Sequence, residues 1–262
     1  METVAQLRDL NPSYVSITYG AGGSTRHKTV ELVSKIKKET GIESAAHLTC
    51  VGHSKEEIKN VLDDLDRAGV ENILALRGDP TKGQTEFKAN PAGFKFASEL
   101  VSFIKSQYFF SIGVAGYPEK HVEAVDMESD LLHLKEKVNA GGDFIVTQLF
   151  FNNHAYFSYV DKVRALGINV PVVAGLMPIT DTDQIKRFSD MCGAKLPLDL
   201  LVKLENAGGN KEKVVQIGID HAVAQARELL SKGAPGIHFY TLNKSHSTRA
   251  IFKKLKIEGL VK

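Results

Sequence analysis

The sequence has no tryptophan and only two cysteines, Cys50 and Cys192, in 262 residues. Two such separate cysteines make no metal-type cluster, and little cysteine is typical of a reducing compartment. No apolar run approaches the about 20 residues that span a bilayer, and the N-terminal segment lacks the apolar core of a signal peptide. The formal net charge is only +2, which gives no reason to expect nucleic acid. We expect a cytoplasmic protein without a membrane or nucleic-acid partner.

The chain is 43% hydrophobic and 24% charged, an ordinary globular composition. Short apolar runs alternate with longer amphipathic ones, and most of the short runs are continuous rather than alternating, as in parallel strands buried on both faces. The predicted strands are Tyr14–Thr18, Glu43–Thr49, Asn72–Leu76, Phe109–Ala115, Phe144–Phe150, Val170–Leu176 and Gly236–Thr241.

The intervening segments have helical spacing. Ile58, Val61, Leu62 and Leu65 form one apolar stripe, and Ser54 stands where a capping box with a glutamate three residues later would begin the helix. Strand–helix alternation at about 30-residue spacing predicts right-handed β-α-β units. The fold class is therefore α/β, a (β/α)8 TIM barrel forming a single domain over residues 1–262. Only seven strands are found, and the opening segment METVAQLRDL has a helical pattern, so we expect that either one strand escapes the pattern or the first strand of the barrel is absent from this chain.

The segment SYVSITYGAGGSTR, residues 13–26, contains a glycine-rich loop. A dinucleotide-binding fingerprint needs glycines at its first, third and sixth places. Gly20 and Gly22 meet the first two requirements, but Thr25 occupies the sixth. The loop by itself indicates a strand, a tight turn and a helix.

Catalytic groups of such barrels lie at the carboxyl ends of the strands. No strand interior carries a lysine, which argues against a Schiff-base aldolase. No His-x-His pair or carboxylate cluster converges, which argues against a metal hydrolase. The strand ends are instead rich in hydrogen-bonding and aromatic groups, which suits a large planar ligand.

Several positions admit either a functional or a structural role. Asp79 could orient a ligand or could cap a turn, and His47, in an apolar run, is more often a core residue. Gln148 lies in a predicted buried strand, where its amide needs partners that a ligand could supply. Gln184 and Phe188 share one helix face and could together bind a conjugated ligand, although Phe188 could equally be a residue of the hydrophobic core.

Taken in order, the segments VSITYGAGGS, AAHLTC, ALRGD, GYPEKH, DLLHLKEKVNAGGDFIVTQLFF, GLMPI and HFYTLNK resemble the strand-end motifs of the methylenetetrahydrofolate reductase family. The resemblance extends over almost the whole chain. It implies a flavin-dependent barrel that binds FAD. The flavin is reduced by NADH or NADPH and passes hydride to 5,10-methylenetetrahydrofolate, a step of one-carbon metabolism that feeds methionine biosynthesis.

The resemblance also implies a role for individual residues. Asp79 and Gln148 are the expected catalytic residues. The expected cofactor contacts are Thr18, Tyr19, Ala21, His47, Arg77, Gly78, Asp79, Ala97, Tyr117, His121, Ala124, Asp130, His133 and Lys137. The expected folate contacts are Asp79, Gln148, Gln184, Phe188 and Lys244. Lys244 replaces an arginine of some members, so an ammonium point charge takes the place of a guanidinium that can form two parallel hydrogen bonds.

One family motif is missing. The general acid of the family is a glutamate on the first strand, in a motif of the type Phe-Glu-Phe-Phe-Pro-Pro, and this sequence has no such motif. We therefore expect weak folate turnover by this chain. The alternatives are a flavin-binding barrel inactive toward folate, with a binding or scaffold role, and a reductase of a non-folate acceptor. The length favours a stand-alone, bacterial-type reductase, and the resemblance implies a small-molecule substrate and a homo-oligomer.

Overall fold

The computed structural model describes residues 1–19, 26–80 and 87–261, and the structural statements below concern these residues. The chain divides into two compact units. The first consists of Met1–Ala115 with His133–Phe144, and the second of Gly116–Leu132 with Ile145–Lys262. Each unit is described by itself.

The fold is α/β of the (β/α)8 type, as the sequence predicts. The described residues form seven strands and ten helices. Every recorded strand pairing in either unit is parallel and joins strands that are consecutive in the chain. This is the pattern that repeated right-handed β-α-β units produce. The first described element is a helix, as expected from its pattern, and a strand follows it.

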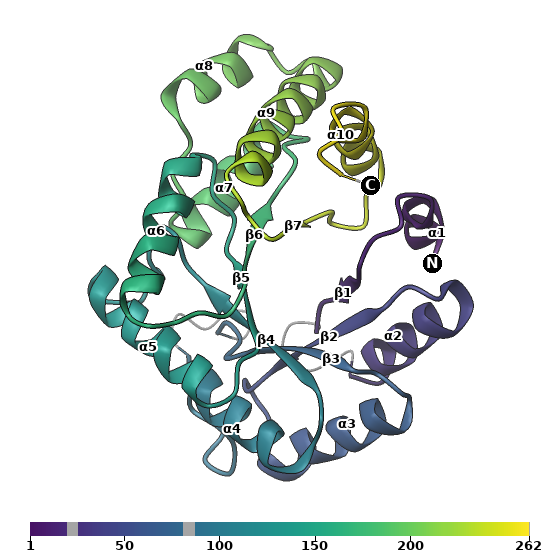
Figure 1. Ribbon diagram of the computed structural model, residues 1–262, viewed down its shortest axis with the longest axis vertical. Coiled ribbons are helices and arrows are strands. Elements are labelled where there is room, and N and C mark those ends of the chain that lie inside the picture. Colours follow the sequence, from purple (N-terminus) through teal and green to yellow (C-terminus); the bar gives the residue numbers. More distant parts are fainter. Residues whose placement is uncertain (20–25, 81–86, 262) are drawn as a thin grey trace. The chain divides into compact units, whose positions relative to one another are not determined.

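The first unit contains strands β1 to β4, of which β4 ends at the first residue of the second unit. Within the unit, Ile17 pairs with Ala46, Ala46 with Ile73, and Ile73 with Ile112. Figure 1 shows helices α2 and α3 on the same side of β2 and β3. The elements are α1 Glu2–Arg8, β1 Val15–Ile17, α2 Arg26–Thr40, β2 Ser44–Thr49, α3 Lys55–Arg67, β3 Asn72–Leu76, α4 Ala97–Gln107 and β4 Ser111–Gly116.

Local sequence explains how these elements begin and which way the strands face. Ser54 caps α3: its hydroxyl accepts from the Glu57 N–H, and the Glu57 carboxylate accepts from the Ser54 N–H, which confirms the predicted capping box. The Ser44 hydroxyl donates to the Val33 carbonyl of α2 over 3.0 Å, so this face of β2 is turned toward the helix. Because side chains alternate along a strand, His47 points to the opposite face.

The second unit contains β5, β6 and β7. Ile145 pairs with Val172, and Ala174 pairs with Ile237. Helices α9 and α10 pack side by side (Figure 1). The elements are α5 Met127–Asn139, whose first part belongs to this unit, β5 Phe144–Thr147, α6 Asn153–Ala165, β6 Val172–Leu176, α7 Thr182–Cys192, α8 Leu198–Asn206, α9 Lys211–Ser231, β7 Ile237–Phe239 and α10 His246–Ile257.

A hydrophobic cluster of the second unit lies under the segments that follow its strands. Leu149, Phe151, Ile179 and Ile185 belong to it, together with residues of α8 and α9. Gly218 of α9 lets that helix approach the loop after β6, because a Cβ built on Gly218 would lie 2.0 Å from the Ile179 carbonyl oxygen. The loops that carry predicted site residues therefore rest on a packed core.

No helix in the described part of the chain is long and apolar enough to cross a membrane.

Candidate functional site

In the first unit, predicted site residues meet at the carboxyl ends of neighbouring strands. Thr18 directly follows β1, His47 lies in β2, and Arg77 directly follows β3. The parallel register places these strand ends along one edge of the sheet. His47 is half-buried, whereas the other residues of β2 are buried. The structure thus places His47 on the sheet face opposite the helices, which is compatible with a ligand contact.

The segment after β3 has a backbone that favours glycine. Gly78 has a φ of +89°, which an L-residue with a side chain rarely adopts, and a Cβ there would lie 2.7 Å from the Val51 side chain. The Arg77 guanidinium lies 4.5 Å from the centre of the Phe87 ring. Asp79 follows as an exposed carboxylate. Gly78 is therefore fixed by both conformation and packing, and the strand end presents an arginine and an aspartate in sequence.

The remaining predicted residues of the first unit are more dispersed. The Tyr19 ring is buried against the His53 ring, 5.6 Å between centres. The Lys137 ammonium donates to the Ala115 carbonyl over 2.6 Å, which places a positive charge at the end of β4. His133 is exposed one turn earlier on α5, and Ala97 is the first residue of α4. Ala21 lies outside the described residues.

In the second unit, four predicted residues gather in the segment before α5 and in the first turn of that helix. The buried Asp130 carboxylate accepts from the His121 N–H over 3.2 Å. The His121 ring meets the Tyr117 ring edge-on, 4.7 Å between centres, and the Ala124 N–H donates to the His121 carbonyl. His121 Nδ1 accepts from the Glu123 N–H over 3.1 Å, so a neutral ring carries its proton on Nε2.

Gln148 differs from its predicted setting. The strand β5 ends at Thr147, so Gln148 follows the strand rather than lying inside it, and it is half-buried rather than buried. Its side-chain oxygen accepts from the Leu149 N–H over 2.9 Å, and its backbone N–H donates to the Gly116 carbonyl. The argument from a fully buried amide is therefore wrong. The position is still compatible with a functional role, because its amide nitrogen has no hydrogen-bond partner among the described residues.

Tyr240 is a residue that the sequence analysis missed. It follows β7, and its hydroxyl donates over 2.7 Å to the carbonyl of Thr147, at the end of β5. The ring reaches there by passing over Gly175 of β6, where a Cβ would lie 2.8 Å from Tyr240 Cε2 and 2.2 Å from the Thr147 carbonyl oxygen. The Thr147 hydroxyl accepts from the Gly175 N–H over 2.9 Å. Tyr240 thereby fixes the residue that precedes Gln148. The sequence feature that could have indicated Tyr240 is an aromatic residue at a strand end, in the segment FYTLNK.

Helix α7 carries Gln184 and Phe188 one turn apart, as their spacing predicts. The Asp181 carboxylate caps this helix by accepting from the Gln184 N–H over 2.8 Å. Both side chains are half-buried, and Phe188 packs against the hydrophobic cluster of the second unit, as does Tyr240. Phe188 thus combines a core contact with partial exposure, and its role in ligand binding stays a prediction.

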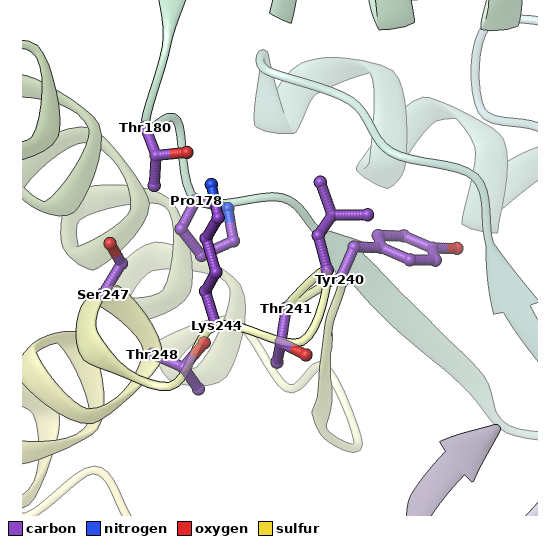
Figure 2. A pocket seen from close by; sticks show the side chains of 8 residues that line it. Pro178, Thr180, Tyr240, Thr241, Lys244, Ser247 and Thr248 are labelled. Atoms are coloured by element: carbon purple, nitrogen blue, oxygen red, sulfur yellow. The ribbon is translucent and has the colours of Figure 1, made fainter. Parts of the chain in front are cut away.

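Lys244 lies in a pocket between the end of β7, the loop after β6 and the start of α10. Figure 2 shows its side chain extending toward Thr180 and Pro178. The pocket also includes Thr241, Leu242, Ser247 and Thr248, and it encloses about 270 Å³, including space that opens to solvent. The pocket is therefore a small hollow, partly open to solvent, lined by hydroxyl groups and the Lys244 side chain.

Helix α9 supports the segment that carries Gln148, a role that the sequence analysis did not anticipate. His221 Nε2 lies 3.0 Å from the Phe151 carbonyl oxygen, and the Gln225 amide donates to the Phe150 carbonyl over 3.2 Å. Asn153 donates to the Gln225 carbonyl and to the Glu228 carboxylate. Burial lowers the pKa of His221, so at neutral pH its ring is uncharged and donates through Nε2. No periodicity would reveal such polar residues on a largely buried helix face.

The described residues contain no group of three or more histidine, cysteine, aspartate or glutamate side chains that could hold a metal ion. The arrangement in each unit is one of hydrogen-bond donors, aromatic rings and single charges at strand ends. Such groups can bind and orient a large polar ligand.

Comparison with known proteins shows the family to which the chain belongs. Residues 1–256 match the family model described as methylenetetrahydrofolate reductase. The chain is 38% identical over 265 residues to methylenetetrahydrofolate reductase (NADH) 1 of Arabidopsis thaliana, covering 97% of this chain and 45% of that protein. It is 34% identical over 257 residues to 5,10-methylenetetrahydrofolate reductase of Escherichia coli, covering 97% of this chain and 84% of that protein. The chain thus spans less than half the length of the plant relative.

The fold has a counterpart among solved structures. A protein from Clostridium thermocellum that binds two copies of 5-methyl-5,6,7,8-tetrahydrofolic acid aligns with a TM-score of 0.56 and 18% identity, covering 97% of this chain and 99% of that one. At this identity the likeness concerns the fold alone. The sequence matches are much stronger, and they place the chain in the methylenetetrahydrofolate reductase family.

Proposed function

We propose that this chain reduces 5,10-methylenetetrahydrofolate to 5-methyltetrahydrofolate, with FAD as its bound cofactor and NADH or NADPH as the reductant. The observation that carries the proposal is the family match over residues 1–256. The position of the predicted residues at strand ends within each unit supports it, because catalytic groups of this fold class lie there.

The polar groups present fit the diphosphate and ribose of FAD. His121 has a donor on Nε2, Lys137 has a positive charge at the end of β4, and each is a natural partner for phosphate oxygens. When bound, FAD supplies the capacity to accept a hydride from the nicotinamide and to give one to the folate. Arg77, Gly78 and Asp79 would border its ring system, where the Asp79 carboxylate disfavours negative charge on the reduced ring.

The second unit holds the proposed folate contacts. The Gln148 amide nitrogen would donate a hydrogen bond to the pterin or, in the other half-reaction, to the nicotinamide. Phe188 would stack on the aminobenzoate ring, with Gln184 one turn away. Lys244 would face a glutamyl carboxylate, because its pocket brings an ammonium group together with hydroxyl groups.

The experiment that tests the proposal separates the two half-reactions. The purified protein should be yellow, and the released cofactor should run as FAD on chromatography. NADH or NADPH added without oxygen should bleach the flavin, and 5,10-methylenetetrahydrofolate should restore its colour with formation of 5-methyltetrahydrofolate. Recovery of FMN alone would contradict the cofactor assignment. Bleaching without any reoxidation by the folate would favour a flavin barrel that serves another acceptor or another role.

A further inference from the structure

The start of helix α10 is an electropositive end whose N-cap residue provides no capping side-chain hydrogen bond. The helix begins at His246, and the side chain of the N-cap residue, Ser245, makes no capping hydrogen bond. Its first turn contains no acidic residue. The first N–H groups of a helix have no acceptor within the helix, and the helix dipole adds partial positive charge there. This end of α10 therefore favours an anion.

The pocket beside it contains a buried hydroxyl that lacks a partner. Thr248 is 6% exposed, and its Oγ1 has no hydrogen-bond partner in the described part of the chain. Thr248 lines the same pocket as Lys244, and Figure 2 shows it on α10 beside the pocket. A buried polar group without a partner costs about 1–3 kcal/mol. Valine has nearly the same shape and lacks this cost, so a hydroxyl here calls for an acceptor that binds in the pocket.

The loop before α10 is also strained. Leu242 has a φ of +48° and Asn243 a φ of +59°, so two consecutive residues adopt the left-handed conformation. Left-handed backbone is unfavourable for leucine, and such strain is concentrated at ligand-binding sites. The strained turn is what joins Tyr240 and Thr241, on one wall, to Lys244 and the helix start on the other.

We propose that Thr248 is a specificity-determining residue that binds the glutamyl tail of the folate together with Lys244. A carboxylate has two oxygens, and a lysine ammonium is a point charge without the paired donors of an arginine. The Thr248 hydroxyl supplies the second donor, and the uncapped start of α10 adds its positive potential. This inference rests on the proposed function, because it takes the anion to be the tail of a folate.

The test measures binding of two ligands to the full chain by calorimetry. One is 5-methyltetrahydrofolate, and the other is 5-methyltetrahydropteroate, which lacks the glutamyl group. Thr248→Val should weaken binding of the first about tenfold or more, since hydrogen bonds to charged groups contribute about 1.5–3 kcal/mol. Binding of the second should not change. Thr248→Ser keeps the hydroxyl and should keep the affinity for both ligands.

Ser189→Ala is the matched control. Ser189 of α7 is 4% exposed, its hydroxyl also lacks a partner among the described residues, and it does not line the pocket. Its loss should leave both affinities unchanged. Thr248→Val should also melt no lower than the unaltered chain, because it removes a polar group that has no partner in the unliganded protein. A stable variant with reduced tail binding is what separates recognition from a structural role.

Four results would overturn the inference, and they are distinguishable. Equal weakening of both ligands by Thr248→Val would show a structural effect. Unchanged binding of both ligands by Thr248→Val would show that the pocket does not bind the glutamyl tail. The same conclusion would follow if inorganic phosphate bound in a Thr248-dependent way while the two ligands bound with equal affinity. If the unaltered chain binds neither ligand, the proposed function itself is wrong and the inference falls with it.

Discussion

Replacing Gly175 with alanine should disturb the contact by which Tyr240 holds the end of β5. The added Cβ would lie 2.2 Å from the Thr147 carbonyl oxygen and 2.8 Å from Tyr240 Cε2. The carbonyl belongs to a paired strand and the ring is hydrogen-bonded to it, so neither moves aside cheaply and the contact between Tyr240 and Thr147 must be disturbed. Overpacking costs about 1–3 kcal/mol, and losing the 2.7 Å hydrogen bond from Tyr240 adds about 0.5–1.5 kcal/mol. The free energy of unfolding should therefore fall by about 1.5–4.5 kcal/mol.

Thermal unfolding checks this value, since 1 kcal/mol corresponds to roughly 2–4 °C for a domain of 150–250 residues. Gly236→Ala is the matched control: no atom lies within 4 Å of its added Cβ, and it should leave stability unchanged or raise it slightly. Because Gln148 follows Thr147, Gly175→Ala should also weaken folate binding. If Gly175→Ala melts like Gly236→Ala and binds the folate normally, the close approach at Gly175 does not have the role assigned to it.

Three further predictions concern the flavin, the pH and the missing motif. Asp79→Asn should raise the flavin potential and slow hydride transfer to the folate more than reduction by NADH; equal slowing in rapid-mixing experiments would contradict this. Burial lowers the pKa of His238 from 6.5 to about 4. Between these values the unfolded chain binds the proton that the folded chain excludes, so stability falls as the pH is lowered through this window, by at most about 3 kcal/mol. Urea titrations at several pH values should show that the free energy of unfolding falls less steeply with decreasing pH in His238→Gln. An identical fall in the variant and the unaltered chain would refute the role of His238. An added N-terminal strand carrying Phe-Glu-Phe-Phe-Pro-Pro should raise folate turnover by about 10²–10⁴-fold, whereas the same strand with glutamine should raise only the melting temperature; unchanged turnover would mean that the proton comes from another group.

The sequence predicts the strands well because their signal is local. Asn72–Leu76 is observed with its predicted bounds, and the capping box at Ser54 is present as expected. The end of β5 was predicted three residues too late. Apolar residues resume at Leu149 and Phe150, but the Phe150 carbonyl accepts from Gln225 of α9 instead of from a strand. A contact between residues 75 positions apart leaves no mark on a local pattern.

The candidate site could be predicted in part for the same reason. Residues at strand ends follow from the strand pattern, so Thr18, Arg77 and Lys244 lie at or near the ends where they were expected. Tyr240 and Thr248 were missed because their importance depends on what surrounds them. A tyrosine that passes over a glycine of another strand, and a threonine hydroxyl left without an acceptor, become visible only in three dimensions.

The contacts of α9 predict which of its positions would tolerate substitution in a saturation-mutagenesis experiment. His221 and Gln225 face carbonyls of the segment after β5, and Gly218 admits the Ile179 carbonyl of the loop after β6. Substitutions along this stripe would register as loss of activity even though α9 carries none of the predicted cofactor or folate contacts. Exposed positions of the same helix, such as Gln216 and Ala224, would tolerate exchange. Tolerance to substitution along α9 would thus vary with the helical period. The intolerant positions would mark the side of the helix that holds the two loops in place.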